Sequence, residues 1–147
     1  MSSINQLFSE IKENKLAPIY FLMGEETYYI DLISDYIESH VLTDQEKGFN
    51  QVILYGKDVS VQDIISHAKR YPMMADRQVV IVKEAQNLSK TIDQLIDYVK
   101  NPQTSTVLVF KYKYKTLDKR KALYKSLFNE KTFNKNSIYI FFHFFNF

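Results

Sequence analysis

Hydrophobic and polar positions along this chain follow two alternating spacings. Short runs rich in apolar residues, such as "APIYFLMG" and "RQVVIVKEA", are typical of strands buried on both faces of a sheet. Between these runs, apolar residues recur every three or four positions, which is the spacing of amphipathic helices. The pattern predicts strands at residues 17–24, 49–56, 77–85 and 105–112, and helices at 3–13, 25–42, 60–71, 89–101 and 118–130.

The order of these elements predicts the fold class. Strands that alternate with helices are typical of βαβ units, whose strands run parallel and whose helices cover the sheet. We therefore expect an α/β domain with three layers, in which a parallel sheet carries helices on both faces.

Individual residues indicate where two helices begin and which sides face the core. Ser60, followed by Asp63 three positions later, is the expected N-cap of one helix, and Asp118 is the expected N-cap of the basic helix. The side chains expected to point inward are Tyr29, Leu32, Ile33, Tyr36 and Ile37 in the helix at 25–42, and Val61, Ile64, Ile65 and Ala68 in the helix at 60–71.

The amino-acid composition excludes several classes of protein. The chain is 46% hydrophobic and 24% charged, as in ordinary globular domains. It has no apolar run near the ~20 residues of a membrane-spanning helix, and its first residues lack the pattern of a signal peptide. Without cysteine, disulfides and thiolate metal sites are excluded. We expect a cytoplasmic protein that does not associate with membranes.

The turn after the first strand is where a parallel α/β domain would bind a nucleotide. A P-loop has several glycines and a lysine there. This turn has Gly24 alone, followed by Glu25 and Glu26, whose charges suit a helix N-terminus but repel a triphosphate. The third strand ends in Lys83 and Glu84 rather than in the two acids of a Walker B motif. We therefore expect a degenerate nucleotide site and no cofactor.

The histidines and the remaining acids form no recognisable catalytic or metal-binding pattern. None of His40, His67 and His143 has a second ligand at metal-binding spacing. We expect His67 to lie at the surface or at the boundary of the core, and we expect no catalytic residue and no metal.

Basic residues are concentrated near the end of the last regular strand. Residues 111–125 hold seven basic side chains and one acid, although the whole chain carries only +2. Basic and aromatic residues alternate in "KYKYK", which suits contact with single-stranded nucleic acid, but also suits an ordinary strand end with solvated lysines. The candidate patch that faces DNA or a partner is Lys111, Lys113, Lys115, Lys119, Arg120 and Lys121.

The segment "RYPMMADRQVVIV" poses a different question. Met73 and Met74 follow a proline between a predicted helix and a predicted strand. Either they close the core between helix and sheet, or they are exposed to a partner. Methionine is common at adaptable binding surfaces, and a preceding proline limits the freedom of a loop.

The final residues differ from the rest of the chain. Six of the last eleven are aromatic. Three interpretations remain: an edge strand, a short tail that associates with membranes, or a truncated end that is not native to the fold. We favour the last and expect an atypical tail at residues 133–147.

Taken in order, three segments resemble a known family. They are "PIYFLMGEETYYID", "FNQVILYGKDVSVQDIISHAKRYPMMADRQVVIVKEAQNL" and "STVLVFKYKYKTLDKRKALYKSL". Together they resemble the N-terminal domain of the delta subunit of bacterial DNA polymerase III, over about Leu16 to Leu127. The resemblance implies an AAA+-like domain at residues 1–132 that has lost its ATP site. It also implies that the lid and collar domains of that family are absent here.

The resemblance further implies a function. Family members are non-catalytic clamp-loader subunits that insert apolar residues into a pocket of the sliding clamp and open the ring. The matching positions are Tyr71, Pro72, Met73 and Met74, with Ala75 and Asp76 beside them. The expected partners are the sliding clamp, the other loader subunits in the full-length protein and, indirectly, DNA. Two alternatives stay open: a nucleic-acid-binding domain that uses residues 111–125, and a nucleotide-binding enzyme with an atypical phosphate site.

Overall fold

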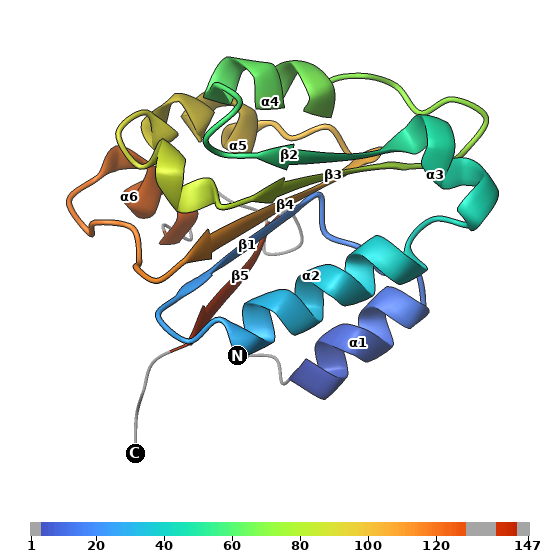
Figure 1. The fold of residues 1–147 in the computed structure, drawn as a ribbon, viewed down its shortest axis with the longest axis horizontal. Coiled ribbons are helices and arrows are strands. Elements are labelled where there is room, and N and C mark those ends of the chain that lie inside the picture. Colours follow the sequence, from blue (N-terminus) through green and yellow to red (C-terminus); the bar gives the residue numbers. More distant parts are fainter. Residues whose placement is uncertain (1–3, 129–137, 144–147) are drawn as a thin grey trace.

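A single parallel sheet forms the centre of the molecule (Figure 1). The computed structural model describes residues 4–128 and 138–143. Five strands pair in the order β2-β3-β4-β1-β5, and every pairing is parallel. The strands are β1 (Ile19–Gly24), β2 (Gln51–Tyr55), β3 (Gln78–Lys83), β4 (Thr106–Lys113) and β5 (Ile138–His143).

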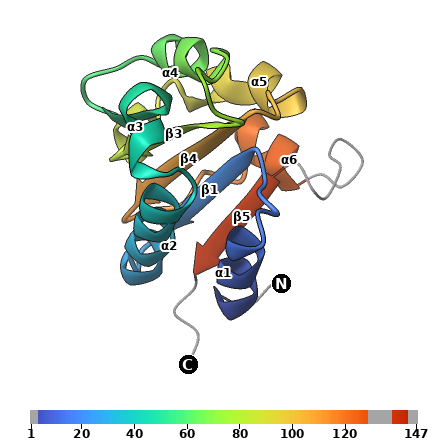
Figure 2. The same cartoon turned by 90° about the vertical axis from the view of Figure 1, so that its right-hand side faces the viewer.

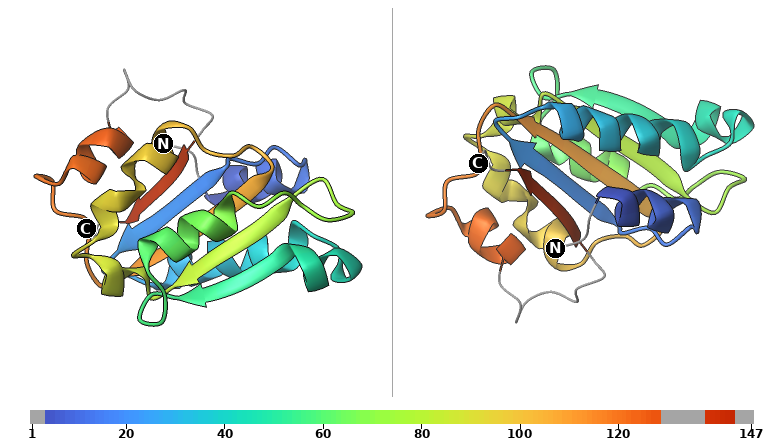
Figure 3. Two further views of the ribbon diagram at one scale, coloured as in Figure 1. Left: turned by 90° about the horizontal axis from the view of Figure 1, so that it is seen from above. Right: turned by 90° about the horizontal axis from the view of Figure 1, so that it is seen from below.

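Helices cover both faces of this sheet (Figures 2 and 3). One face carries the first two helices, and the other carries the fourth helix together with the later helical turns. The α-helices are α1 (Ile4–Lys12), α2 (Tyr28–His40), α3 (Asp44–Asn50), α4 (Val61–Ala68), α5 (Ile96–Lys100) and α6 (Ala122–Phe128). Two 3₁₀ turns, η1 (Ala85–Leu88) and η2 (Ile92–Leu95), join β3 to α5. The predicted three-layer α/β architecture is confirmed.

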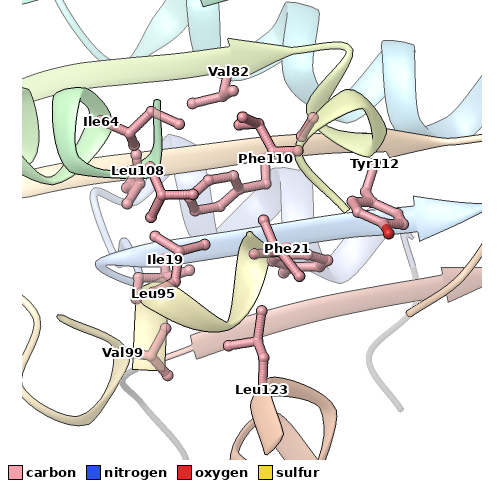
Figure 4. Packing of buried hydrophobic residues seen from close by; sticks show 14 of the residues in the cluster. Ile19, Phe21, Ile64, Val82, Leu95, Val99, Leu108, Phe110, Tyr112 and Leu123 are labelled. Atoms are coloured by element: carbon pink, nitrogen blue, oxygen red, sulfur yellow. The ribbon is translucent and has the colours of Figure 1, made fainter. Parts of the chain in front are cut away.

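Each face of the sheet has its own hydrophobic core, because successive side chains of a strand point to opposite sides. On the side of α4, the ring of Phe21 lies 5.4 Å from that of Phe110 and 5.7 Å from that of Tyr112 (Figure 4). On the side of α2, Tyr20 and Leu22 of the same strand are buried against α1 and α2. Residues in the described helices form no segment long and apolar enough to cross a membrane.

Several local predictions were right and some were wrong. Ser60 caps α4 as predicted, in a reciprocal pair of hydrogen bonds with Asp63. The buried face of α2, however, is rotated from the one predicted. Ile30, Ile33, Ser34 and Ile37 are buried, whereas Leu32 is exposed. Tyr36 is only half-buried, because its ring packs against Phe8 of α1 rather than against the sheet.

Two helical segments also differ from the sequence prediction. Phe49 and Asn50 end α3, which begins at a Thr43–Glu46 capping box, instead of starting the second strand. Asp118 does not cap α6. Its carboxylate binds the backbone and side chain of Arg120 in the turn before the helix. Instead, Asp93 of η2 accepts a hydrogen bond from the Leu123 backbone N–H at the start of α6, at 3.0 Å.

The aromatic end of the chain contributes a strand. β5 lies beside β1 in parallel register, from Ile19 opposite Ile138 to Gly24 opposite His143. Residues 138–143 therefore form an edge strand, and the sheet extends past residue 132, whereas the prediction of a truncated end that is not native to the fold stays a prediction. The rest of the predicted tail, residues 133–137 and 144–147, lies outside the described residues.

Candidate functional site

The connection between α4 and β3 presents an apolar surface to solvent. It lies at the end of the sheet where the strands begin, next to α3 (Figure 1). Tyr71 is 83% exposed, Met73 is 58% exposed and Met74 is 98% exposed, whereas Pro72 is half-buried. Both methionines therefore point outward, and neither closes the core. We call the segment Tyr71–Asp76 the apolar loop.

The middle of the apolar loop is fixed to α3 by a buried asparagine. The Asn50 side chain accepts a hydrogen bond from the Met73 backbone N–H at 2.6 Å and donates one to the Met73 carbonyl at 2.8 Å. The same amide nitrogen also lies 3.0 Å from the carbonyl of Glu46. Because Asn50 is only 4% exposed, these bonds are shielded from competition with water.

The chain leading into the apolar loop is fixed to the sheet. The Gln78 side-chain amide, buried at the start of β3, donates to the carbonyl of Arg70 at 2.6 Å. Thr106 of β4 donates its hydroxyl proton to the carbonyl of Ala68, also at 2.6 Å. After the loop, Arg77 binds the Asn14 side chain at 2.9 Å. The loop backbone is therefore held at both ends and in the middle, which lowers the entropy lost when its side chains dock.

Met74 has an unusual backbone conformation. Its φ of 55° lies in the left-handed region, which costs a side-chain-bearing residue of order 1–3 kcal/mol. The side chain gains almost nothing within the monomer in return, since it is 98% exposed. Contacts within the monomer therefore do not offset the cost of this backbone conformation.

Replacing Met74 by glycine tests whether the Met74 side chain contributes to the stability of the monomer or only to binding of a partner. Glycine adopts a positive φ without steric cost, but it loses more entropy on folding, by about 0.5–1 kcal/mol. Because relief of about 1–3 kcal/mol of strain outweighs this cost, we expect Met74→Gly to leave the free energy of unfolding unchanged or to raise it by up to about 2 kcal/mol, while weakening binding of any partner that contacts the Met74 side chain. Urea denaturation measures the first effect. A loss of more than about 2 kcal/mol would show that Met74 stabilises the monomer.

Phe49 extends the same surface, and the sequence prediction missed it. It is 80% exposed at the end of α3. Phe49, Tyr71 and Met73 line one hollow, with the amides of Asn50 and Gln78 also in its wall. The residue was assigned to a strand, where an aromatic side chain is expected to be buried. The Thr43–Glu46 spacing of a capping box was the signal that predicts a helix there instead.

The six predicted basic residues do not form one exposed patch. Lys111 is buried and Lys113 largely so, because both face α2 and pair with the Asp31 carboxylate at 2.9 and 2.7 Å. Lys115, Lys119 and Arg120 are exposed, and Lys121 is half-buried. Arg120 pairs with Asp118, and this pairing lowers the pKa of Asp118 to about 2. The lysine–aromatic alternation does separate the two kinds of residue, since Tyr112 packs in the opposite core.

The ion cluster of Asp31, Lys111 and Lys113 makes stability depend on pH. Partial burial of Asp31 acts to raise the pKa of its carboxyl, but hydrogen bonds and attraction from Lys113 and Lys111 outweigh it and lower that pKa. A lowered pKa in the folded state stabilises the fold above the ordinary value of 3.8, and this contribution is lost as the pH falls through the folded-state value.

We therefore expect Asp31→Asn to lower the free energy of unfolding at pH 7. The reduction should be about 1–2 kcal/mol, because the carboxylate is 41% exposed and the pair is screened by solvent. At pH 3 the difference from the unchanged chain should shrink. Urea denaturation at both values measures it, with Asp35→Asn on the exposed side of α2 as the control. Equal losses at pH 7 and pH 3 would contradict this explanation.

The turn Gly24-Glu25-Glu26 joins β1 to α2, as the sequence predicts. The Glu26 carboxylate accepts a hydrogen bond from the Tyr28 backbone N–H at 2.8 Å, at the N-terminus of α2. A side-chain carboxylate thus binds a backbone N–H at this helix N-terminus. Within residues 4–128, no group of three acidic or histidine side chains is placed to hold a metal ion, and His67 is a boundary residue as expected.

Comparison with known proteins places these features in one family. The family model described as DNA polymerase III, delta subunit, matches residues 20–140, which extends beyond the predicted resemblance. DNA polymerase III subunit delta of Bacillus subtilis (strain 168) is 28% identical over 130 residues, which cover 82% of this chain and 38% of that protein.

Solved structures agree with the sequence match. The Bacillus subtilis DNA clamp loader delta protein superposes with a TM-score of 0.79 at 27% identity, over 96% of this chain and 42% of that one. A DNA polymerase III gamma subunit-related protein from Thermotoga maritima superposes with a TM-score of 0.56 at 12% identity, over 99% of this chain and 47% of that one, and shows the fold alone.

These comparisons agree with the α/β fold class of a parallel sheet covered by helices. The chain spans 38–42% of the length of the Bacillus subtilis relatives that it matches. Because the family model covers more than half of the chain, one conclusion follows: the chain belongs to the DNA polymerase III delta subunit family.

Proposed function

We propose that this chain is a non-catalytic clamp-loader module, working in the cytoplasm, that binds the sliding clamp and helps to open it through the apolar loop. The observation that carries the proposal is the exposure of Met73 and Met74 on a backbone fixed by Asn50. In the full-length protein, the module would act together with the other loader subunits and reach DNA only indirectly.

The physics of the loop suits an apolar plug. Interface hot spots are apolar side chains that enter well-packed pockets, and methionine adapts to irregular pockets because it is unbranched and polarizable. Five hydrogen bonds hold the apolar loop and its flanking residues. From this fixed backbone, the large side chains of Tyr71, Met73 and Met74 extend into solvent. Since most of the ordering has already occurred in the free chain, less free energy is lost on docking.

The alternative functions lose support. Lys111 and Lys113 are committed to Asp31, which leaves fewer cations for nucleic acid. A nucleotide would have to displace the Glu26 carboxylate from the start of α2. Binding of the full-length subunit to its cognate clamp, with and without the Met73 and Met74 side chains, tests the proposal.

A further inference from the structure

A second part of the chain contributes to the surface around the apolar loop. Phe49 lies 22 residues before Tyr71 in sequence, yet both line the hollow that Met73 also borders. An aromatic side chain that is 80% exposed at a helix end buries little surface of its own in the monomer. Tyr71 and Met73, which line the same hollow, are exposed as well, so that three large apolar side chains gather around it. Continuous exposed apolar area marks interaction sites.

The spacing between Phe49 and Met73 is fixed. Asn50, the next residue after Phe49, points inward and bonds both the N–H and the carbonyl of Met73. This paired arrangement resembles one rung of a β-ladder, with a side-chain amide in place of a backbone one. Phe49 and Met73 therefore present their side chains from two segments that are joined by adjacent, buried hydrogen bonds.

Two amide side chains in the wall of this hollow are already engaged within the chain. Both polar atoms of the Asn50 amide and the nitrogen of the Gln78 amide are already bonded within the chain. The walls also include Val52 and Val79. The hollow also has polar walls at Gln51, His67 and Arg70, and the side-chain oxygen of Gln51 has no hydrogen-bond partner among the residues that the structure describes. A mainly apolar protein surface that carries a hydrogen-bond donor would gain contact area there without displacing the bonds of Asn50 and Gln78.

We propose that α3 supplies a second anchor for the sliding clamp. Phe49 contacts the clamp beside the site entered by Met73 and Met74, and Asn50 is the positioning residue that holds the two anchors at a fixed separation. This inference rests on the proposed function, because the partner is the same. It adds a second contact, from a residue at the end of α3 that the sequence pattern places in a strand.

The first test measures binding of the cognate sliding clamp to the full-length subunit that carries Phe49→Ala. We expect the dissociation constant to rise about tenfold or more, mostly through faster dissociation, with an unchanged melting temperature. Phe49→Leu should keep part of the affinity. The matched control is Tyr28→Ala, since Tyr28 is 62% exposed at the opposite end of the sheet. Binding within twofold of the unchanged protein would overturn the role of Phe49.

The second test concerns Asn50 and uses a double-mutant cycle. Asn50→Ala should weaken clamp binding about tenfold alone, but much less in a chain that already carries Met73→Ala and Met74→Ala, because the bonds act by placing Met73. Equal losses in both backgrounds would show that Asn50 acts only on folding. If Met73 and Met74 themselves prove dispensable, the proposed function fails. If they matter and Phe49 does not, only the second anchor fails.

Discussion

Replacing Met73 and Met74 together by alanine is expected to weaken binding of the cognate sliding clamp at least about 100-fold. Truncation of an interface hot spot costs about 2 kcal/mol or more, and 1.4 kcal/mol corresponds to a tenfold change in the dissociation constant. The fold should be unaffected, because the side chains are 58% and 98% exposed. Calorimetry or surface plasmon resonance with the full-length subunit measures the affinity, and thermal denaturation measures the fold.

A double variant at the other end of the sheet is the matched control. Tyr28 and Tyr114 are 62% and 63% exposed and follow the carboxyl ends of β1 and β4, far from the start of β3. Tyr28→Ala with Tyr114→Ala removes a comparable apolar surface and should leave clamp binding within about twofold, since neither residue borders the apolar loop. If the control weakens binding as much as the methionine variant does, the effect is not specific to the loop.

Replacing Gly56 by alanine is expected to destabilise the fold more than the substitutions at Asp31 and Met74. Gly56 follows β2 and donates its N–H to the carbonyl of Lys83 at 2.8 Å. A Cβ atom at this position would lie 2.2 Å from the carbonyl oxygen of Glu84, which is backbone and cannot rotate away. Overpacking of this kind costs about 1–3 kcal/mol, and we expect the upper part of that range. Urea denaturation monitored by circular dichroism measures the loss.

Gly48 provides the opposite case in the same experiment. It is exposed within α3, and a Cβ atom there would meet nothing within 4 Å. Gly48→Ala should therefore stabilise the chain by about 0.5–1 kcal/mol, because alanine favours helix more than glycine does. Similar effects of the two substitutions would mean that general backbone flexibility, rather than the close approach at Glu84, determines the result.

The sequence by itself determined the fold class of this protein and those features whose interacting residues are near neighbours in the chain. Unbroken β-branched runs between amphipathic helices specify a parallel sheet covered on both faces, since both faces of each central strand must be apolar. The sequence also predicted hydrogen bonds between groups that lie close together in the chain. The Ser60–Asp63 capping box formed as predicted. The Glu26 carboxylate, placed by the sequence at the start of a helix, accepts a hydrogen bond from the Tyr28 backbone N–H there.

Residues whose partners lie far away in sequence could not be assigned in this way. The sequence pattern around Lys111 predicts a lysine in solvent, but in the folded chain its side chain pairs with Asp31 of α2. The sequence pattern predicts Asp118 as a helix N-cap, but Asp93 of η2 accepts the hydrogen bond from the backbone N–H at the start of α6. In each case the local pattern allowed two outcomes of similar free energy, and a contact between distant segments selected one.

The apolar loop also combines a feature that the local sequence predicts with one that only a distant contact determines. Sequence alone placed Pro72, Met73 and Met74 between a helix and a strand, but could not decide whether the methionines were buried, because apolar residues suit both the core and an interface. The tertiary structure decided it through Asn50, whose side chain reaches 23 positions along the chain to hold the Met73 backbone. With the loop bonded to α3, its backbone groups are satisfied within the protein and its side chains extend into solvent.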